Sequence, residues 1–317
     1  MPSDRLEWLP AARIGAVARV VVTRRLAGEA LERLSAQHDV DVWEGELPPS
    51  EGELHARVAE AEGLLSLLTE RVDEALLAAA PRLRVVSNYA VGFDNIDVAA
   101  CAARGVAVGT TGDVLTDATA DLALALLLAA ARHLPDARDA ARAGRWRTWE
   151  PQGWLGLELR GARLAIVGAG RIGRATADRA RAFGMEVELL GRDGDLRAAL
   201  ARADAVSLHA PLRPETRHLI DATALGAMRP GTILVNTARG GLVDQAALLE
   251  ATHVTAALDV TDPEPPPPGD PILNAPHVLV VPHIGSATRA ARERMTAVAV
   301  DNLLAGLAGE PLPHPAG

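Results

Sequence analysis

Short runs of apolar and β-branched residues alternate along the chain with longer stretches in which apolar positions recur every three or four residues. The first part of this series predicts strands at 20–23, 39–43, 63–67 and 83–87, with helices at 27–36, 51–61 and 73–80 between them. Such an alternation favours a parallel sheet covered by helices. No repeat occurs at the periods that are typical of solenoids.

A second strand–helix series follows, with predicted strands at 163–167, 186–190, 205–208, 232–236, 255–259 and 278–281 and a helix at 171–183. The proline run 263–268 excludes regular structure there. A last helix, at 287–304, is placed to return to the first domain. We therefore expect two doubly wound parallel-sheet α/β domains, one of residues 17–112 completed by 288–317 and one of residues 113–287.

Between the two series lies a long helix, predicted at 116–132, with Thr116 as a candidate N-cap and Asp117 and Asp121 in its first turns. Its apolar residues surround it almost completely, which is typical of a helix buried between two domains or at a subunit contact. The arm 144–157 has no regular period and holds three of the chain's five tryptophans. It is interpreted either as an arm attached to its own surface or as one that wraps a partner subunit.

Composition removes several function classes. The 317 residues suit two domains, and a net charge of −9 with 3% aromatic residues disfavours nucleic-acid binding. All 32 cationic residues are arginines, which excludes a Walker A loop and a Schiff-base lysine. The single cysteine, Cys101, excludes an internal disulfide, a cysteine-rich metal site and an iron–sulfur cluster, and it is expected to be a small buried residue.

No targeting or membrane segment is evident. Asp4 and Glu7 precede any apolar run, unlike a signal peptide. The longest apolar run, 122–131, is far shorter than the roughly 20 residues that cross a bilayer. We expect a cytoplasmic protein without a membrane partner and without a metal.

A glycine-rich motif carries the strongest local signal. Gly168, Gly170 and Gly173 follow an apolar strand and open a helix, in the pattern of a dinucleotide-binding loop. The first glycine permits the tight turn, the second admits the pyrophosphate, and the third allows close packing of helix on strand. The helix N-terminus then offers free N–H groups to the phosphates.

The end of the next strand indicates which dinucleotide is bound. Gly191 stands where an NAD site has an acidic residue, and Arg192 follows it. A guanidinium favours a 2′-phosphate, so NADP(H) is the preferred cofactor, with NAD(H) possible. A shifted turn that brings Asp193 to the ribose is the alternative.

Three polar residues follow later strands of the second series, namely Arg239, Glu264 and His283. In a parallel sheet the carboxyl ends of the strands meet at the ligand crevice, so these side chains are expected to converge there. Beyond a dinucleotide-binding motif, they predict an acid–base site.

These motifs together resemble the D-2-hydroxyacid dehydrogenase family, and within it the glyoxylate/hydroxypyruvate reductases. The matching segments occur in the family's order and extend over nearly all of the chain after residue 19: 88–97, 112–117, 146–149, 168–173, 191–192, 236–240, 258–265, 282–288, 302–306 and 309–311. The resemblance implies a Rossmann cofactor domain, a flavodoxin-like substrate domain, and a homodimer joined through the helix and arm at 116–158.

The resemblance also implies roles for single residues in reducing a small 2-keto acid to the D-2-hydroxy acid. His283 is the proton donor, Glu264 fixes its tautomer and favours the imidazolium, and Arg239 binds the substrate carboxylate. The remaining substrate contacts are the backbone N–H groups of Val91 and Gly92, the Ser286 hydroxyl, and Trp149 from the partner's arm. The cofactor contacts are Gly168, Gly170, Arg171, Ile172, Gly173, Gly191, Arg192, Pro211, Thr237, Ala238, His283 and Asp259, the last toward the nicotinamide carboxamide.

Two segments depart from the family pattern by being short. One is 193–202, beside the adenosine end of the cofactor site, and the other is 248–253, in a surface helix and loop. The alternatives to an NADPH-dependent reductase are an NAD-linked relative that acts on another 2-keto acid and a non-catalytic dinucleotide sensor that binds protein partners.

Overall fold

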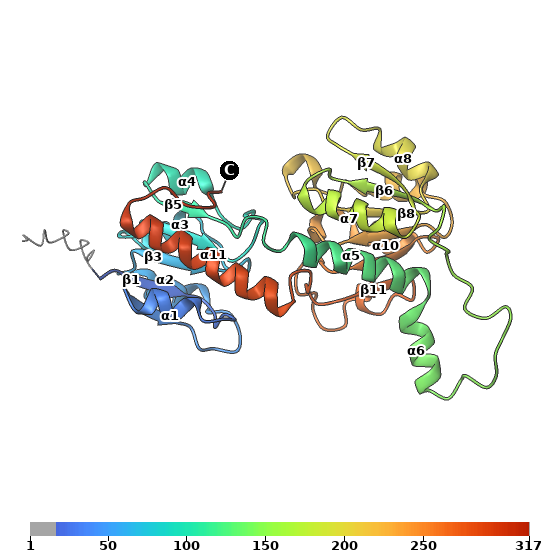
Figure 1. The fold of residues 1–317 in the computed structure, drawn as a ribbon, viewed down its shortest axis with the longest axis horizontal. Helices are drawn as coiled ribbons and strands as arrows, with labels where there is room; N and C mark the ends of the chain where they lie inside the picture. The colour runs from blue at the N-terminus through green and yellow to red at the C-terminus, as the bar shows by residue number, and fades with distance from the viewer. Residues whose placement is uncertain (1–16, 317) are drawn as a thin grey trace, which may run out of the picture. The chain divides into compact units, whose positions relative to one another are not determined.

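A computed structural model describes residues 17–316, so Asp4, Glu7 and the final residue of the predicted segment 288–317 lie outside the described residues. The described chain divides into two compact units. Unit 1 comprises residues 17–112 and 293–316, and unit 2 comprises residues 113–292. Each unit contains one parallel sheet with helices on both faces (Figure 1), which confirms the predicted fold class.

Unit 1 is built on a five-stranded parallel sheet in the order β2-β1-β3-β4-β5. This order is the flavodoxin-like one, in which the chain winds to either side of its first strand. The strands are β1 (Arg19–Val22), β2 (Asp39–Val42), β3 (Gly63–Ser66), β4 (Val85–Asn88) and β5 (Ala107–Gly109). The helices are α1 (Ala30–Ser35), α2 (Glu51–Val58), α3 (Glu74–Ala79), α4 (Val98–Ala103) and α11 (Arg289–Ala308), of which the last begins in unit 2.

Alternation along these strands sends side chains to two cores. Leu64 and Val86 belong to the cluster under α2, α3 and α4, which also contains the buried Cys101. On the opposite face α11 packs so closely that a Cβ at Gly306 would lie 2.6 Å from Val85. The last helix, α11, therefore covers the second face of the unit 1 sheet. Burial raises the pKa of the Cys101 thiol to about 11, as fits a small apolar core residue.

Unit 2 is built on a six-stranded parallel sheet in the order β11-β10-β9-β8-β6-β7. The strands are β6 (Arg163–Val167), β7 (Glu186–Leu190), β8 (Ala205–Leu208), β9 (Ile233–Asn236), β10 (Thr255–Leu258) and β11 (Val278–Val280). A Rossmann sheet in the order 3-2-1-4-5-6 has one more strand beyond the second. Here β7 is the edge strand, and the short segment 193–202 leads through one helix directly to β8.

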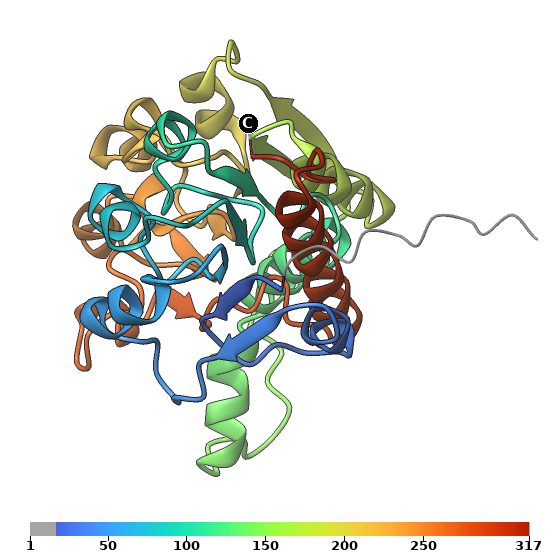
Figure 2. The same cartoon turned by 90° about the vertical axis from the view of Figure 1, so that its left-hand side faces the viewer.

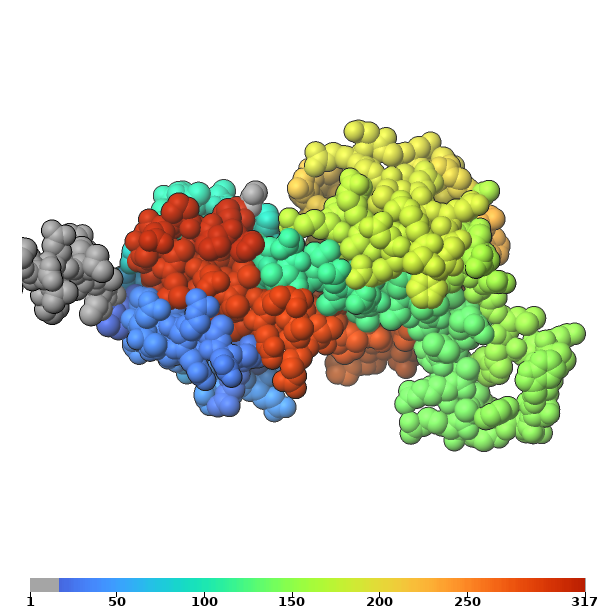
Figure 3. Space-filling view, viewed as in Figure 1, coloured from blue at the N-terminus to red at the C-terminus, as the bar shows by residue number. Residues whose placement is uncertain are grey.

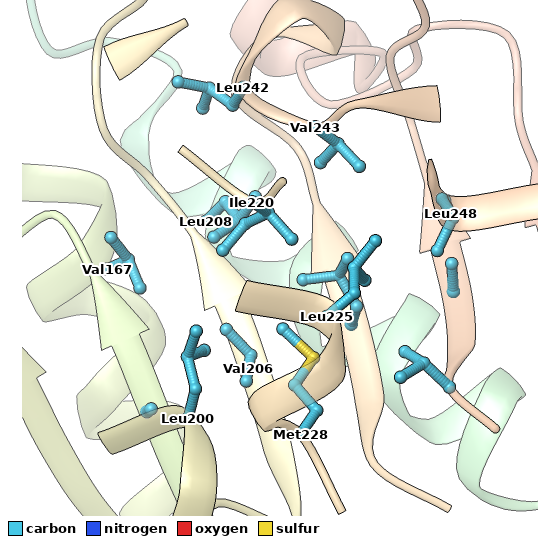
Figure 4. Close-up of a cluster of buried hydrophobic side chains, with 14 of the residues drawn as sticks. Val167, Leu200, Val206, Leu208, Ile220, Leu225, Met228, Leu242, Val243 and Leu248 are labelled. Atoms are coloured by element: carbon cyan, nitrogen blue, oxygen red, sulfur yellow. The ribbon is translucent and has the colours of Figure 1, made fainter. Parts of the chain in front are cut away.

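The two faces of this sheet carry separate cores. Leu164 and Ile166 of β6 point to the face covered by α5 (Thr116–Ala131) and α7 (Arg171–Ala182), whereas Val167 belongs to the opposite core. Figure 4 shows that second core, which contains Leu208, Leu225 and Leu248. Its covering helices are α8 (Leu196–Arg202), α9 (Ala222–Ala227) and α10 (Gln245–Glu250). Three short 3-10 turns complete the unit: η1 (Pro214–Thr216), η2 (Gly240–Leu242) and η3 (Pro271–Leu273).

The long apolar helix is α5, and its burial has a local cause. It packs against α7, β9 and β10 within unit 2. The predicted cap is wrong: Thr116 is the first helical residue, and Leu115 occupies the N-cap position without a side-chain hydrogen bond.

Within residues 17–316 no single helix is long and apolar enough to span a membrane, although α5 and α6 (Leu134–Arg142), bent by 59°, pass that test as a pair.

The arm 144–157 projects from unit 2 together with α6 in both ribbon views and in the space-filling view (Figures 1, 2 and 3). Its end is attached to α5, because the Leu157 N–H donates to the Ala131 carbonyl at 2.9 Å. Its tryptophans are not attached: Trp146, Trp149 and Trp154 are 76%, 79% and 53% exposed. The exposure of these side chains fits an arm that wraps a partner subunit, and that interpretation stays a prediction.

Candidate active site

The turn between β6 and α7 has the backbone that the glycine motif predicts. Gly168 has a φ of +107°, and a Cβ there would lie 2.5 Å from the His209 carbonyl carbon. A Cβ at Gly173 would lie 2.0 Å from the Gly168 carbonyl oxygen, so only glycine allows this approach of helix to strand. These two positions are occupied by the protein's own backbone and leave no room for a side chain.

Gly170 differs, because a Cβ there would meet no protein atom within 4 Å. It is the N-cap of α7, and the amides of Arg171, Ile172 and Gly173 lie in the first turn, where helix geometry provides no intrahelical acceptor. Open space in front of unpaired N–H groups fits a pyrophosphate. Thr237 Oγ1, after β9, is a further polar atom that is buried without a partner.

The end of β7 is open and carries an exposed arginine. A Cβ at Gly191 would meet no atom within 4 Å, and Arg192 and Asp193 are exposed. In the described part of the chain the Arg192 side chain makes no hydrogen bond or ion pair. Asp195 is engaged, since it caps α8 by accepting from the Ala198 N–H at 3.0 Å. The arrangement leaves a guanidinium available to an anionic group.

His283 and Glu264 are brought together after β11 and β10. His283 Nδ1 is hydrogen-bonded to Glu264 Oε1, and the two side chains are 26% and 32% exposed. The His283 backbone has a φ of +49°, and its N–H donates to the Asp259 carbonyl at 2.9 Å. A ring whose Nδ1 is paired in this way presents Nε2 for proton transfer.

Asp259 supports the turn that carries His283. It is 1% exposed and accepts from the N–H groups of Ile284 at 2.6 Å and Gly285 at 2.8 Å. Burial raises the pKa of the Asp259 carboxyl, and these two hydrogen bonds and the nearby His283 partly offset the effect. The sequence predicts Asp259 only as a partner of the nicotinamide carboxamide; its role in shaping the 283–285 turn was missed.

Arg239 follows the neighbouring strand, β9. Asn236 shapes its turn, because Nδ2 donates to the Arg239 carbonyl at 2.8 Å and Oδ1 accepts from the Ala238 N–H at 3.0 Å. Arg239 Nη1 donates to the Ala238 carbonyl at 2.9 Å. Because β9, β10 and β11 are adjacent and parallel, Arg239, Glu264 and His283 lie at one edge of one sheet.

Three other predicted residues are less engaged. Ser286 is half-buried, directly after the Gly285 turn, and exposed Pro211 accepts from Thr216 Oγ1 at 2.7 Å through its carbonyl. Trp149 is exposed on the arm, so its contact with a partner's site stays a prediction.

Val91 and Gly92 lie in a loop of unit 1 that is held by asparagines. Asn88 Nδ2 donates to the Gly92 carbonyl at 2.8 Å and lies 3.3 Å from Asn95 Oδ1. Asn95 Nδ2 in turn donates to the carbonyls of Leu67 and Glu70. The loop therefore has a defined shape within its own unit.

Comparison with known proteins places the chain among dehydrogenases. The model of the D-isomer specific 2-hydroxyacid dehydrogenase NAD binding domain matches residues 124–285. A glyoxylate reductase from Aeropyrum pernix is 44% identical over 317 aligned positions, covering 93% of this chain and 95% of that protein.

Two of the solved structures that resemble the chain illustrate the similarity. A Thermus thermophilus protein has 48% identity and a TM-score of 0.89, covering 94% of this chain and 100% of that one. The NADPH-dependent glyoxylate/hydroxypyruvate reductase of Sinorhizobium meliloti, solved with NADP and malonate, has 32% identity and a TM-score of 0.84, covering 95% and 97%.

Proposed function

Because the chain belongs to the D-isomer specific 2-hydroxyacid dehydrogenase family, we propose that it reduces glyoxylate to glycolate and hydroxypyruvate to D-glycerate, with NADPH as the preferred reductant. The observation that carries the proposal is the His283–Glu264 pair one strand away from Arg239. It provides a proton donor, a group that orients it and a fixed cation at one sheet edge. Relatives named glyoxylate reductase support the choice of substrate.

Unit 2 would bind the cofactor, and the Val91 and Gly92 amides stay predicted contacts of the substrate. The residues that would hold the dinucleotide are Gly168, Gly170, Arg171, Ile172, Gly173, Gly191, Arg192, Pro211, Thr237, Ala238 and Asp259. The bound nicotinamide would supply hydride to the keto carbon. Gly191 and Arg192 favour NADPH, because a guanidinium without an acidic neighbour at position 191 suits a 2′-phosphate.

The protein's own groups would manage charge and protons at the keto acid. Arg239 would bind the carboxylate through its planar fork of donors and polarise the carbonyl. His283, as imidazolium, would donate the Nε2 proton to the carbonyl oxygen as negative charge develops there. Glu264 would keep the hydrogen bond from Nδ1 and so stabilise the charged ring before the transfer.

The test is a steady-state assay of glyoxylate and hydroxypyruvate, each with NADPH and with NADH. NADPH-dependent turnover of both substrates is expected. Turnover with NADH alone would retain the dehydrogenase and discard the assignment of the cofactor. Exposed Asp193, in the same turn as Arg192, is the residue that would then hold the ribose. The absence of turnover with either cofactor would refute the proposed substrates.

The exposed tryptophans of the arm support a homodimer as the working assembly. Trp146, Trp149 and Trp154 are all more than half exposed on one arm, and neighbouring exposed apolar side chains of this size are typical of an interaction surface. Sedimentation of the wild type is expected to show a dimer, and the double variant Trp146→Ala/Trp149→Ala is expected to shift it toward monomer. A cytoplasmic location remains a prediction.

A further inference from the structure

Gln245, the first residue of α10, forms two hydrogen bonds with the backbone of one residue in the loop that carries Glu264. Gln245 Nε2 donates to the Asp262 carbonyl at 2.6 Å, and Gln245 Oε1 accepts from the Asp262 N–H at 2.9 Å. Both halves of the side-chain amide are used, and so are both backbone polar groups of Asp262. A reciprocal pair of this kind fixes orientation as well as distance.

The loop needs such support because its own sequence removes backbone donors. Residues 263 and 265–268 are prolines, which have no N–H to donate. Between Thr261 and Pro268 only Thr261, Asp262 and Glu264 retain one. The Thr261 N–H faces Glu264 Oε2 at 3.4 Å, so the Asp262 N–H bonded to Gln245 is one of the few backbone anchors available.

The same side chain links the Glu264 loop to the turn that follows Arg239. That turn runs through η2 into α10, and a Cβ at Gly240 would lie 2.0 Å from the Thr261 carbonyl carbon. The Leu242 N–H donates back to the Arg239 carbonyl at 3.2 Å. Gln245 thus connects the segment bearing the carboxylate-binding arginine to the segment bearing the partner of His283.

We infer that Gln245 is a positioning residue, which holds Asp262 so that the Glu264 carboxylate stays hydrogen-bonded to His283 Nδ1. The inference rests on the proposed function only for its kinetic consequence. The fold around Gln245 has its own support, because Leu242, Val243 and Leu248 are at most 2% exposed in the core of unit 2. Loss of the amide is therefore expected to loosen the loop rather than to unfold the unit.

The kinetic test compares Gln245→Met, which keeps the length and removes both hydrogen bonds, with Gln245→Glu, which keeps only the acceptor. Gln245→Met is expected to lower kcat with glyoxylate roughly 10- to 100-fold, as displaced catalytic groups do, while the KM for NADPH stays unchanged. The kcat of Gln245→Glu should lie between those of Gln245→Met and the wild type. Gln37→Met, a matched change at an exposed glutamine of unit 1, should change nothing.

A double-variant cycle separates positioning from general damage. In a Glu264→Gln background, Gln245→Met should have little additional effect, because the carboxylate it positions is already gone. Full additivity of the two effects would overturn the inference.

A spectroscopic measurement without substrate keeps the inference separate from the proposed function. The His283 Nδ1 proton, held by a carboxylate, should give a low-field imidazole resonance that disappears in Glu264→Gln. It should weaken or broaden in Gln245→Met, with faster exchange of the Asp262 amide. An unchanged resonance would refute the role of Gln245. If Gln245→Met loses the resonance but the wild-type protein does not reduce glyoxylate, only the proposed function is refuted.

Discussion

Replacing Gly191 by aspartate tests the cofactor assignment with little risk to the fold. The position has open space for a side chain, it is exposed, and its φ lies outside the left-handed region. An exposed substitution of this kind changes stability by about 0.5 kcal/mol or less. The new carboxylate would lie where the 2′-substituent of the adenosine ribose is expected, beside Arg192.

The size of the effect follows from what the aspartate changes. A charge-assisted hydrogen bond between Arg192 and a 2′-phosphate contributes about 1.5–3 kcal/mol, and the exposure of the site favours the lower half of that range. The aspartate opposes this contact and instead accepts from the ribose hydroxyls of NADH. The ratio of kcat/KM for NADPH to that for NADH should therefore fall by about 2 kcal/mol, or roughly 30-fold.

The assay is initial-rate reduction of glyoxylate with both dinucleotides at two ionic strengths. Arg192→Ala should lower kcat/KM for NADPH and leave that for NADH nearly unchanged, and this loss should shrink in high salt. Arg181→Ala, which removes an exposed charge at the other end of α7, should leave the ratio intact. If Gly191→Asp retains the wild-type ratio, the reasoning from Gly191 and Arg192 is wrong.

Three further predictions follow from the geometry. Arg239→Ala should lower kcat/KM for glyoxylate by about 3–4 kcal/mol, or roughly 100- to 1000-fold, and steady-state kinetics with near-normal values would disprove its role. Gly170→Ala should have the melting temperature of the wild type but bind NADPH at least tenfold more weakly. In Gly173→Ala the new Cβ would lie 2.0 Å from the Gly168 carbonyl oxygen, so this variant should also lose about 2–3 kcal/mol of stability. Equal melting temperatures for the two variants would contradict the packing argument. Burial lowers the pKa of His209 from 6.5 to about 4, so the unfolded chain binds that proton more tightly than the folded chain. The free energy of unfolding should therefore fall by up to about 3 kcal/mol as the pH drops from 6.5 to 4. Urea unfolding of His209→Gln should show a smaller fall over this pH range, and an equal fall in both proteins would exclude this histidine as the cause.

Regular elements with strong periodicity were predictable, because strand composition and helix caps are local signals. The three strands predicted at 163–167, 186–190 and 205–208 have the same bounds in the structure. The end of α5 nearest Thr116 was not predictable in detail, since a threonine beside a helix start satisfies the capping preference whether or not its geometry allows the bond. The six-residue helices α4 and α9 were missed, whereas α1 and α3, which have the same length, lie within the helices predicted at 27–36 and 73–80.

The candidate site divides along the same line. Gly168, Gly173, Glu264 and His283 were predictable because a motif or a strand end fixes where they must lie. The support from Gln245 was not, because it depends on a tertiary contact between α10 and a proline-rich loop that has no signature in sequence. Asp259 was identified, but its bonds to Ile284 and Gly285 depend on a turn with a positive φ that only the structure reveals.

The central claim is that His283 is the proton donor of a dinucleotide-dependent reductase. The most direct measurement is NADPH binding, followed by fluorescence, alongside glyoxylate turnover in His283→Ala. Unchanged NADPH affinity with turnover reduced at least 1000-fold is the predicted result. Turnover within tenfold of the wild type, with binding intact, would contradict the assignment of the catalytic acid.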